Sequence, residues 1–117
     1  MSYLSKAYPE PIVSMFFEAR LWFDKYGGNT YHSVRIHING KVFGCSGMEY
    51  GYENQYQYAT IEKLVAREIL PKEVSNLPVW RIANIYGIHI YTSATYGKRS
   101  EMLRHSLEEE SQETTNE

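Results

Sequence analysis

Two histidines, His32 and His37, are the side chains in this sequence with the clearest potential for chemistry. A neutral imidazole is a good metal ligand and a good general base. Metal sites, however, usually show tighter patterns such as HxH, HExxH or CxxC, and the sequence contains none of these. We therefore expect both histidines to be ordinary surface or partly buried residues, and we predict no metal site and no cofactor.

The carboxylates, the glycines and the single cysteine form no catalytic motif either. Glu18, Glu49 and Glu53 lack the converging spacing, such as DxD or ExxE, that two-metal nuclease chemistry requires. The segment 40–44, GKVFG, lacks the Lys-Ser/Thr ending of a phosphate-binding loop. Cys45 is the single cysteine, so it excludes an intramolecular disulfide framework. We predict no catalytic residue; a small nucleotide-directed hydrolase or nuclease that uses one of the two histidines stays an alternative.

Tyrosine is concentrated near the middle of the chain. Four of the eleven tyrosines lie within residues 50–58, mixed with glycine, asparagine and glutamine. Tyrosine offers a large contact area at low cost in side-chain entropy, and small polar residues offer adaptable hydrogen bonds, a mixture typical of recognition surfaces. We predict a binding site that joins this segment to a loop at 29–32, formed by Asn29, Tyr31, His32, Tyr50, Tyr52, Asn54 and Tyr56.

The expected exposure of the four clustered tyrosines differs. Tyr58 falls on the apolar stripe of a predicted helix, so it should be buried. Tyr50, Tyr52 and Tyr56 lie off that stripe, and we expect them to be at least partly exposed near the 29–32 loop.

Residues 28–35, GNTYHSVR, lead into a strand and an Asn-Gly turn, and a YGY segment follows at residues 50–52. Over about residues 20–70 this arrangement resembles short proteins encoded by bacterial and archaeal viruses. That group has no established activity, so the resemblance implies only a viral accessory protein that acts on a host factor. Our leading hypothesis is a small, non-enzymatic viral accessory protein that binds a host protein or complex through its Tyr/Asn/Gly-rich surface.

The distribution of charge favours nucleic acid as an alternative partner. Residues 1–107 carry twelve Lys+Arg against nine Asp+Glu, whereas residues 108–117 carry five acidic and no basic residues. Six basic side chains would share one face of a sheet with three aromatic stacking platforms: Arg20, Arg35, Lys41, Lys98, Arg99 and Arg104, with Trp22, Tyr31 and Tyr91. An excess of three positive charges is small for a nucleic-acid-binding domain, so we rank this function below protein binding.

The elements that must position these residues follow from periodicity. Alternation of side chains predicts four strands, at residues 14–23, 32–38, 41–45 and 88–96. The second and third strands flank Asn39-Gly40, the preferred pair for a type I′ turn, and therefore form a hairpin. Three- and four-residue spacings of apolar side chains predict helices at residues 54–70 and 78–86, and Ser100 would cap a short helix at residues 100–107. This order predicts an α+β fold, with an antiparallel sheet of about four strands and one or two helices packed on one face.

The length of the chain fits one globular domain, which we expect at residues 1–107, with an irregular arm at 1–13. Residues 108–117 should form an acidic disordered tail. No apolar run approaches the ~20 residues that span a membrane, and residues 1–10 do not form a signal peptide. We therefore expect a cytoplasmic protein, in the host cytoplasm if it is viral, and a homodimer is a further option because strand edges are exposed.

Overall fold

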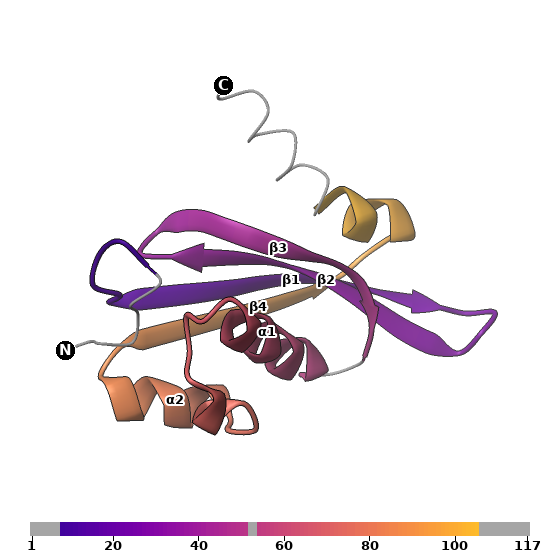
Figure 1. The fold of residues 1–117 in the computed structure, drawn as a ribbon. Coiled ribbons are helices and arrows are strands. Elements are labelled where there is room, and N and C mark those ends of the chain that lie inside the picture. Colours follow the sequence, from indigo (N-terminus) through magenta and orange to yellow (C-terminus); the bar gives the residue numbers. More distant parts are fainter. Residues whose placement is uncertain (1–7, 52–53, 106–117) are drawn as a thin grey trace.

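The computed structural model describes residues 8–51 and 54–105, and its centre is a four-stranded sheet (Figure 1). The strands are β1 (Ser14–Asp24), β2 (Asn29–Ile38), β3 (Lys41–Tyr50) and β4 (His89–Tyr96). Between β3 and β4 the chain forms α1 (Gln55–Ala66), a short 3-10 helix (Lys72–Val74) and α2 (Val79–Tyr86). A further helical segment, residues 99–105, follows β4. The predicted α+β class and the order of elements are confirmed.

The sheet is mixed, whereas we predicted an antiparallel one. Its strand order is β3-β2-β1-β4, and β1 pairs antiparallel with β2 but parallel with β4. The chain leaves β3 and returns through two helices, a connection long enough to place β4 parallel beside β1 on the far side of the sheet. Side-chain alternation is the same in parallel and antiparallel strands, so the sequence pattern did not distinguish the two arrangements.

Alternation along the two central strands builds the core. Met15, Phe17, Ala19 and Leu21 of β1 are all buried on the sheet face that α1 and α2 cover, next to Val34, Ile36 and Ile38 of β2. Ile61 and Leu64 of α1 and Ile82 of α2 complete this layer. Phe23, the next alternate residue of β1, is 49% exposed because the β1–β2 hairpin extends beyond the helices (Figure 1).

Two helices differ in extent or position from the prediction. The first one ends at Ala66 rather than at residue 70, and Glu68 then adopts a left-handed conformation with φ 65°. The last helical segment begins at Arg99, and it packs on the sheet face opposite α1 and α2, so helices lie on both faces. The predicted helix at 78–86 is confirmed as α2, and Gly87 ends it with φ 66°, as a left-handed cap requires.

The Asn-Gly turn joins the hairpin to the preceding arm. Asn39 and Gly40 have φ of 54° and 82°, which are the two positive values of a type I′ turn. The Oδ1 atom of Asn39 accepts hydrogen bonds from the backbone N–H groups of Val13 (2.8 Å) and Ser14 (3.2 Å), and its Nδ2 donates to the carbonyl of Pro11 (2.9 Å). One side chain therefore fixes both the turn and the start of β1.

Substitutions at Asn39 should separate these two roles. Asn39→Gly keeps the left-handed backbone but loses the side-chain hydrogen bonds, so we expect a loss of ~1–2 kcal/mol in the free energy of unfolding. Asn39→Ala loses the same bonds and also the local polar contacts that let asparagine tolerate positive φ, which glycine does not need, so we expect a total of ~2–4 kcal/mol. Urea denaturation measures both values, and equal losses for the two variants would contradict the role of the turn conformation.

Candidate functional site

The sheet face opposite α1 and α2, here called the open face, carries most of the exposed chemistry. The register of the three adjacent strands brings together side chains of alternating residues on this face: Phe16, Glu18, Arg20 and Trp22 of β1, Tyr31, Ser33, Arg35 and His37 of β2, and Tyr91, Ser93 and Thr95 of β4. These residues are polar or aromatic because no apolar layer covers them.

Residues 99–105 cross the middle of the open face and are held there by hydrogen bonds. The Ser33 hydroxyl donates to the Met102 carbonyl (2.7 Å), and Met102 itself is fully buried. His105 Nε2 donates to the Glu18 carbonyl (2.8 Å), and Arg35 Nη2 donates to the His105 carbonyl (2.8 Å). The helical segment therefore rests on β1 and β2 and raises a wall on an otherwise flat surface.

A polar cavity of about 540 Å³ lies against this wall. It is here called the arginine pocket, and it is lined by Arg20, Arg35, Thr95, Tyr96, Glu101, Arg104 and His105. Glu101 is the one carboxylate among these residues, and its Oε1 atom accepts the backbone N–H of Lys98 (2.9 Å) at the start of the helical segment. Three guanidinium groups against one carboxylate give the pocket a net positive charge.

Aromatic side chains flank the pocket along the strands. Trp22 stacks on Tyr31 with ring centroids 5.7 Å apart, and Tyr31 meets Tyr50 of β3 edge to face at 5.9 Å; these three residues are here called the aromatic row. The guanidinium of Arg99 lies 5.7 Å from the Trp22 ring, within the range of a cation–π contact. The row ends at Tyr50, whose side chain is 60% exposed.

The other end of the open face has a second aromatic group. Phe16 and His37 stack with centroids 5.1 Å apart, and they line a cavity of about 480 Å³ together with the exposed Tyr91. His37 Nε2 also donates to Glu18 Oε1 (3.0 Å). Along β1 the order is therefore aromatic, carboxylate, arginine, aromatic, from Phe16 to Trp22.

Two titrating groups at the contact between the helical segment and the sheet, Glu18 and His105, have shifted pKa values. Burial raises the pKa of Glu18, but the hydrogen bond from His37 and nearby positive charge, that of Arg35 included, outweigh it, so the pKa is lowered. Burial lowers the pKa of His105, the Arg35 charge lowers it further, and the bond to the Glu18 carbonyl opposes both. His105 is therefore neutral at neutral pH, and Glu18 carries the negative charge at the centre of the face.

The structure divides the predicted tyrosine-rich site. Tyr31 and Tyr50 lie together in the aromatic row, and the predicted exposure of Tyr50 is confirmed. Residues 29–32 form the start of β2, not a loop, so neighbouring side chains point to opposite faces and His32 is 1% exposed on the helix side. Asn29 is partly buried at the end of the hairpin, and Asn54 precedes α1 without a side-chain capping bond.

The predictions for two tyrosines of α1 were wrong. Tyr56 is 4% exposed, although we predicted it to be at least partly exposed, and Tyr58 is 39% exposed, although we predicted it to be buried. The buried arc of α1 is centred between Thr60 and Leu64, and at 100° per residue this places Tyr56 inside the arc and Tyr58 outside it. Tyr52 lies outside the described residues.

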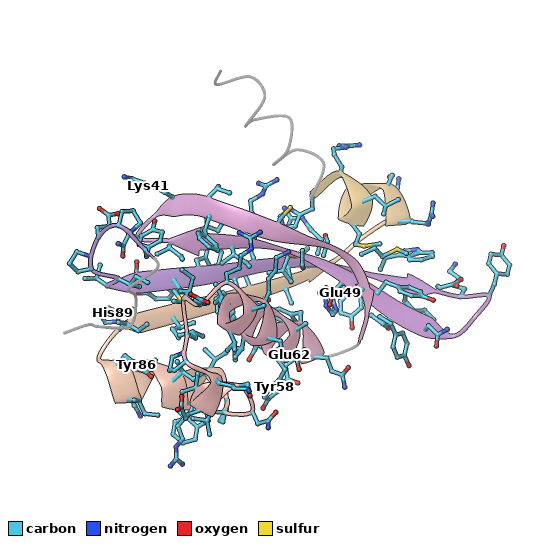
Figure 2. All side chains as sticks on the ribbon, in the orientation of Figure 1. Lys41, Glu49, Tyr58, Glu62, Tyr86 and His89 are labelled. Atoms are coloured by element: carbon cyan, nitrogen blue, oxygen red, sulfur yellow. The ribbon has the colours of Figure 1, made fainter. Side chains whose placement is uncertain are left out.

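The basic residues lie closer to their predicted arrangement than the tyrosines do. Arg20, Arg35 and Arg104 line one pocket, and Arg99 covers Trp22. Lys41 does not join them, because it lies at the Asn-Gly end of β3 (Figure 2). Alternation along the strands already placed Phe16, Glu18 and His37 on the same faces as the arginines, but we did not include these three residues in the predicted site.

No family model matches the chain, and comparisons with curated proteins and with solved structures found no significant match. Within residues 8–51 and 54–105, no three His, Cys, Asp or Glu side chains converge as a metal site. The helices of this part of the chain are also too short or too polar to cross a membrane. The candidate site therefore rests on the geometry of the open face.

The lowered pKa of His105 predicts that docking of residues 99–105 weakens in mild acid. Since the folded pKa lies below the ordinary value of 6.5, the unfolded chain takes up the proton first. The contribution of neutral His105 to the free energy of unfolding is therefore fully present above about pH 6.5 and falls as the pH drops below that value. The lowered pKa of Glu18 adds a separate loss only below its ordinary value of 4.5. Urea denaturation at a series of pH values measures both losses of stability.

A matched pair of substitutions tests whether His105 causes the loss of stability just below pH 6.5. His105→Gln removes the titrating group, so the loss of stability just below pH 6.5 should shrink. His89→Gln changes an exposed histidine of β4 and should keep the pH dependence of the unmodified protein. If His105→Gln leaves the curve unchanged, the assignment is wrong.

Proposed function

We propose that the open face binds a short stretch of single-stranded nucleic acid. The observation that carries the proposal is the arginine pocket between two groups of aromatic rings on one sheet face. A nucleic-acid strand alternates phosphates with bases, and each base offers a flat π surface whatever its identity. A binding surface for such a strand needs cations and rings side by side, and this is the chemistry of the open face.

The arginine pocket supplies the contacts for phosphate. A guanidinium group binds phosphate through two parallel N–H donors and keeps its charge at any physiological pH. Arg104 is exposed at the rim and Arg20 is partly exposed on β1, so both can reach a ligand. Thr95 adds a hydroxyl donor on the β4 side, and Glu101 is already engaged in capping the helical segment.

The aromatic row supplies the contacts for bases. Trp22 and Tyr31 are partly exposed and Tyr50 is largely exposed, so unpaired bases can stack on or between their rings. A base pair in a duplex hides both base faces from a protein, which favours a single strand as the ligand. From Phe16 to Trp22 the face extends ~20 Å along β1, enough for about four nucleotides.

A protein partner, our leading hypothesis from the sequence, stays a prediction. Its support is the exposed Tyr50 at the end of the aromatic row, next to the exposed Met48 of the same edge strand. The viral origin rests on the resemblance of the segment 28–35 alone. A protein partner would also use the aromatic row, but its binding would depend less steeply on salt than binding to phosphates does.

Binding to a fluorescein-labelled single-stranded oligonucleotide of about 12 nucleotides tests the proposal by fluorescence anisotropy. Trp22→Ala should weaken binding by ~1–3 kcal/mol, as expected for the loss of one stacked base. Arg104→Ala should weaken it and reduce the slope of log affinity against log salt by ~1, since one phosphate contact is lost. Duplex of the same length should bind more weakly than the single strand.

Both substitutions have matched controls on the helix layer. Trp80→Ala and Arg81→Ala remove an exposed tryptophan and an exposed arginine of α2, on the other side of the sheet. They should leave affinity and salt dependence unchanged. Flat titrations at low salt with the folded protein, or equal losses in the test and control variants, would overturn the proposal.

Removal of residues 108–117 should strengthen this binding. The deletion removes five acidic residues and no basic one, so the net charge changes from −2 to +3. The truncated chain repels a polyanion less, and the gain in affinity should be largest at low salt, where screening is weakest. Comparison of salt titrations for the two chains measures the effect, and unchanged affinity at low salt would contradict it.

A further inference from the structure

On the opposite face of the sheet, His32 has a buried ring nitrogen that finds no hydrogen-bond partner in the described part of the chain. The His32 Nδ1 atom lies 3.3 Å from the carbonyl oxygen of Gly51. A carbonyl oxygen only accepts hydrogen bonds, so Nδ1 carries the hydrogen and the neutral ring presents a bare lone pair at Nε2. Nε2 is buried and makes no hydrogen bond to any described residue. A buried acceptor of this kind needs a donor, because leaving it unsatisfied is costly.

The charged group that faces this lone pair is a second acceptor. Glu49 Oε1 of β3 lies 3.9 Å from His32 Nε2, too far for a direct hydrogen bond. Two acceptors that face each other need a hydrogen atom between them. That hydrogen comes either from a second proton on His32 or from a donor group of a ligand.

A cavity of about 320 Å³ adjoins this pair, at the end of the sheet where β3 meets α1. It is lined by His32, Tyr50, Gln55, Tyr58, Ala59 and Glu62. Figure 2 shows Glu49 near the end of β3 and Tyr58 and Glu62 on α1. Among the described residues, the lining has one carboxylate, Glu62, with the Glu49 carboxylate beside it, and no lysine or arginine. The cavity therefore favours a positively charged donor.

Gly51 allows the cavity walls to approach each other. A Cβ atom at this position would lie 3.0 Å from His32 Cε1 and 3.1 Å from the Gln55 side chain. Any larger residue would push the histidine and the glutamine apart. The close approach restricts the direction of the imidazole ring and keeps Nδ1 at the Gly51 carbonyl.

We infer that this cavity binds a primary ammonium group. One N–H of the ammonium satisfies His32 Nε2, and its charge is balanced by Glu49 at the rim and by Glu62 in the lining. The rings of Tyr50 and Tyr58 add cation–π attraction. The group belongs to a free alkylamine or to a lysine side chain of a protein. This site lies on the other sheet face from the arginine pocket, so it does not depend on the proposed nucleic-acid function.

Nitrogen NMR of the full-length protein labelled with ¹⁵N-histidine tests the inference at about pH 8, where an unperturbed imidazole is neutral. The His32 signal is assigned by its loss in a His32→Gln variant. Two probes distinguish the sources of the ammonium: 1,4-diaminobutane, and Nα-acetyl-lysine methylamide. We expect a saturable shift of the Nε2 resonance with at least one of them, and the one that binds more tightly identifies the source. Tetramethylammonium has the charge but no N–H donor and should produce no such shift.

Glu49→Gln provides a folded variant with weaker ammonium binding. The substitution keeps the size of this exposed side chain and removes its charge, so stability should be retained while ammonium affinity falls about tenfold. Glu73→Gln removes an exposed carboxylate of the 3-10 helix and should change nothing. A protonated Nε2 at about pH 8 without amine, or no saturable shift with either probe, would show that His32 and Glu49 form an ion pair and that the cavity is not an ammonium site.

Discussion

Side-chain alternation along β1 is the constraint on which the rest of the structure depends. β1 is one of the two central strands and pairs with both β2 and β4, so its two faces define the two layers of the molecule. One set of alternate residues, from Met15 to Leu21, is buried against the helices, and the other, from Phe16 to Trp22, forms the spine of the open face. A shift of one residue in its pairing would exchange core and surface, so the apolar set fixes the position of every polar side chain on the open face.

The helical segment 99–105 turns that open face from a flat surface into a site. Its contacts are few but specific: the Ser33 hydroxyl, the Glu18 carbonyl and the Arg35 guanidinium all bond to it, and Met102 is buried beneath it. The segment adds Arg104 and His105 to the arginine of β1 and so creates a cavity with walls. It also leaves Trp22 and Phe16 on either side, and this separation gives the face its alternation of rings and cations.

At the end of the sheet, the same alternation separates two kinds of chemistry that adjoin in sequence. Tyr31 pairs with Tyr50 across β2 and β3, and His32 pairs with Glu49. The first pair belongs to the aromatic row, and the second lies on the helix side beside α1. A segment that looks uniform in composition therefore contributes to two surfaces, one rich in rings and cations and one rich in acceptors.

The sequence by itself determined the strands and helices, the Asn-Gly hairpin and which side chains of β1 share a face, because these depend on local periodicity and on the backbone preferences of single residues. It also indicated that arginines and aromatic rings would gather on one sheet face. It did not determine the parallel pairing of β4, the rotation of α1 that buries Tyr56 and exposes Tyr58, or the docking of residues 99–105. Those features depend on contacts between distant residues, such as Ser33 with Met102 and Glu18 with His105. Only the tertiary structure decided them, because each depends on burial and hydrogen bonding in the whole folded chain. A short stretch of sequence does not contain that information.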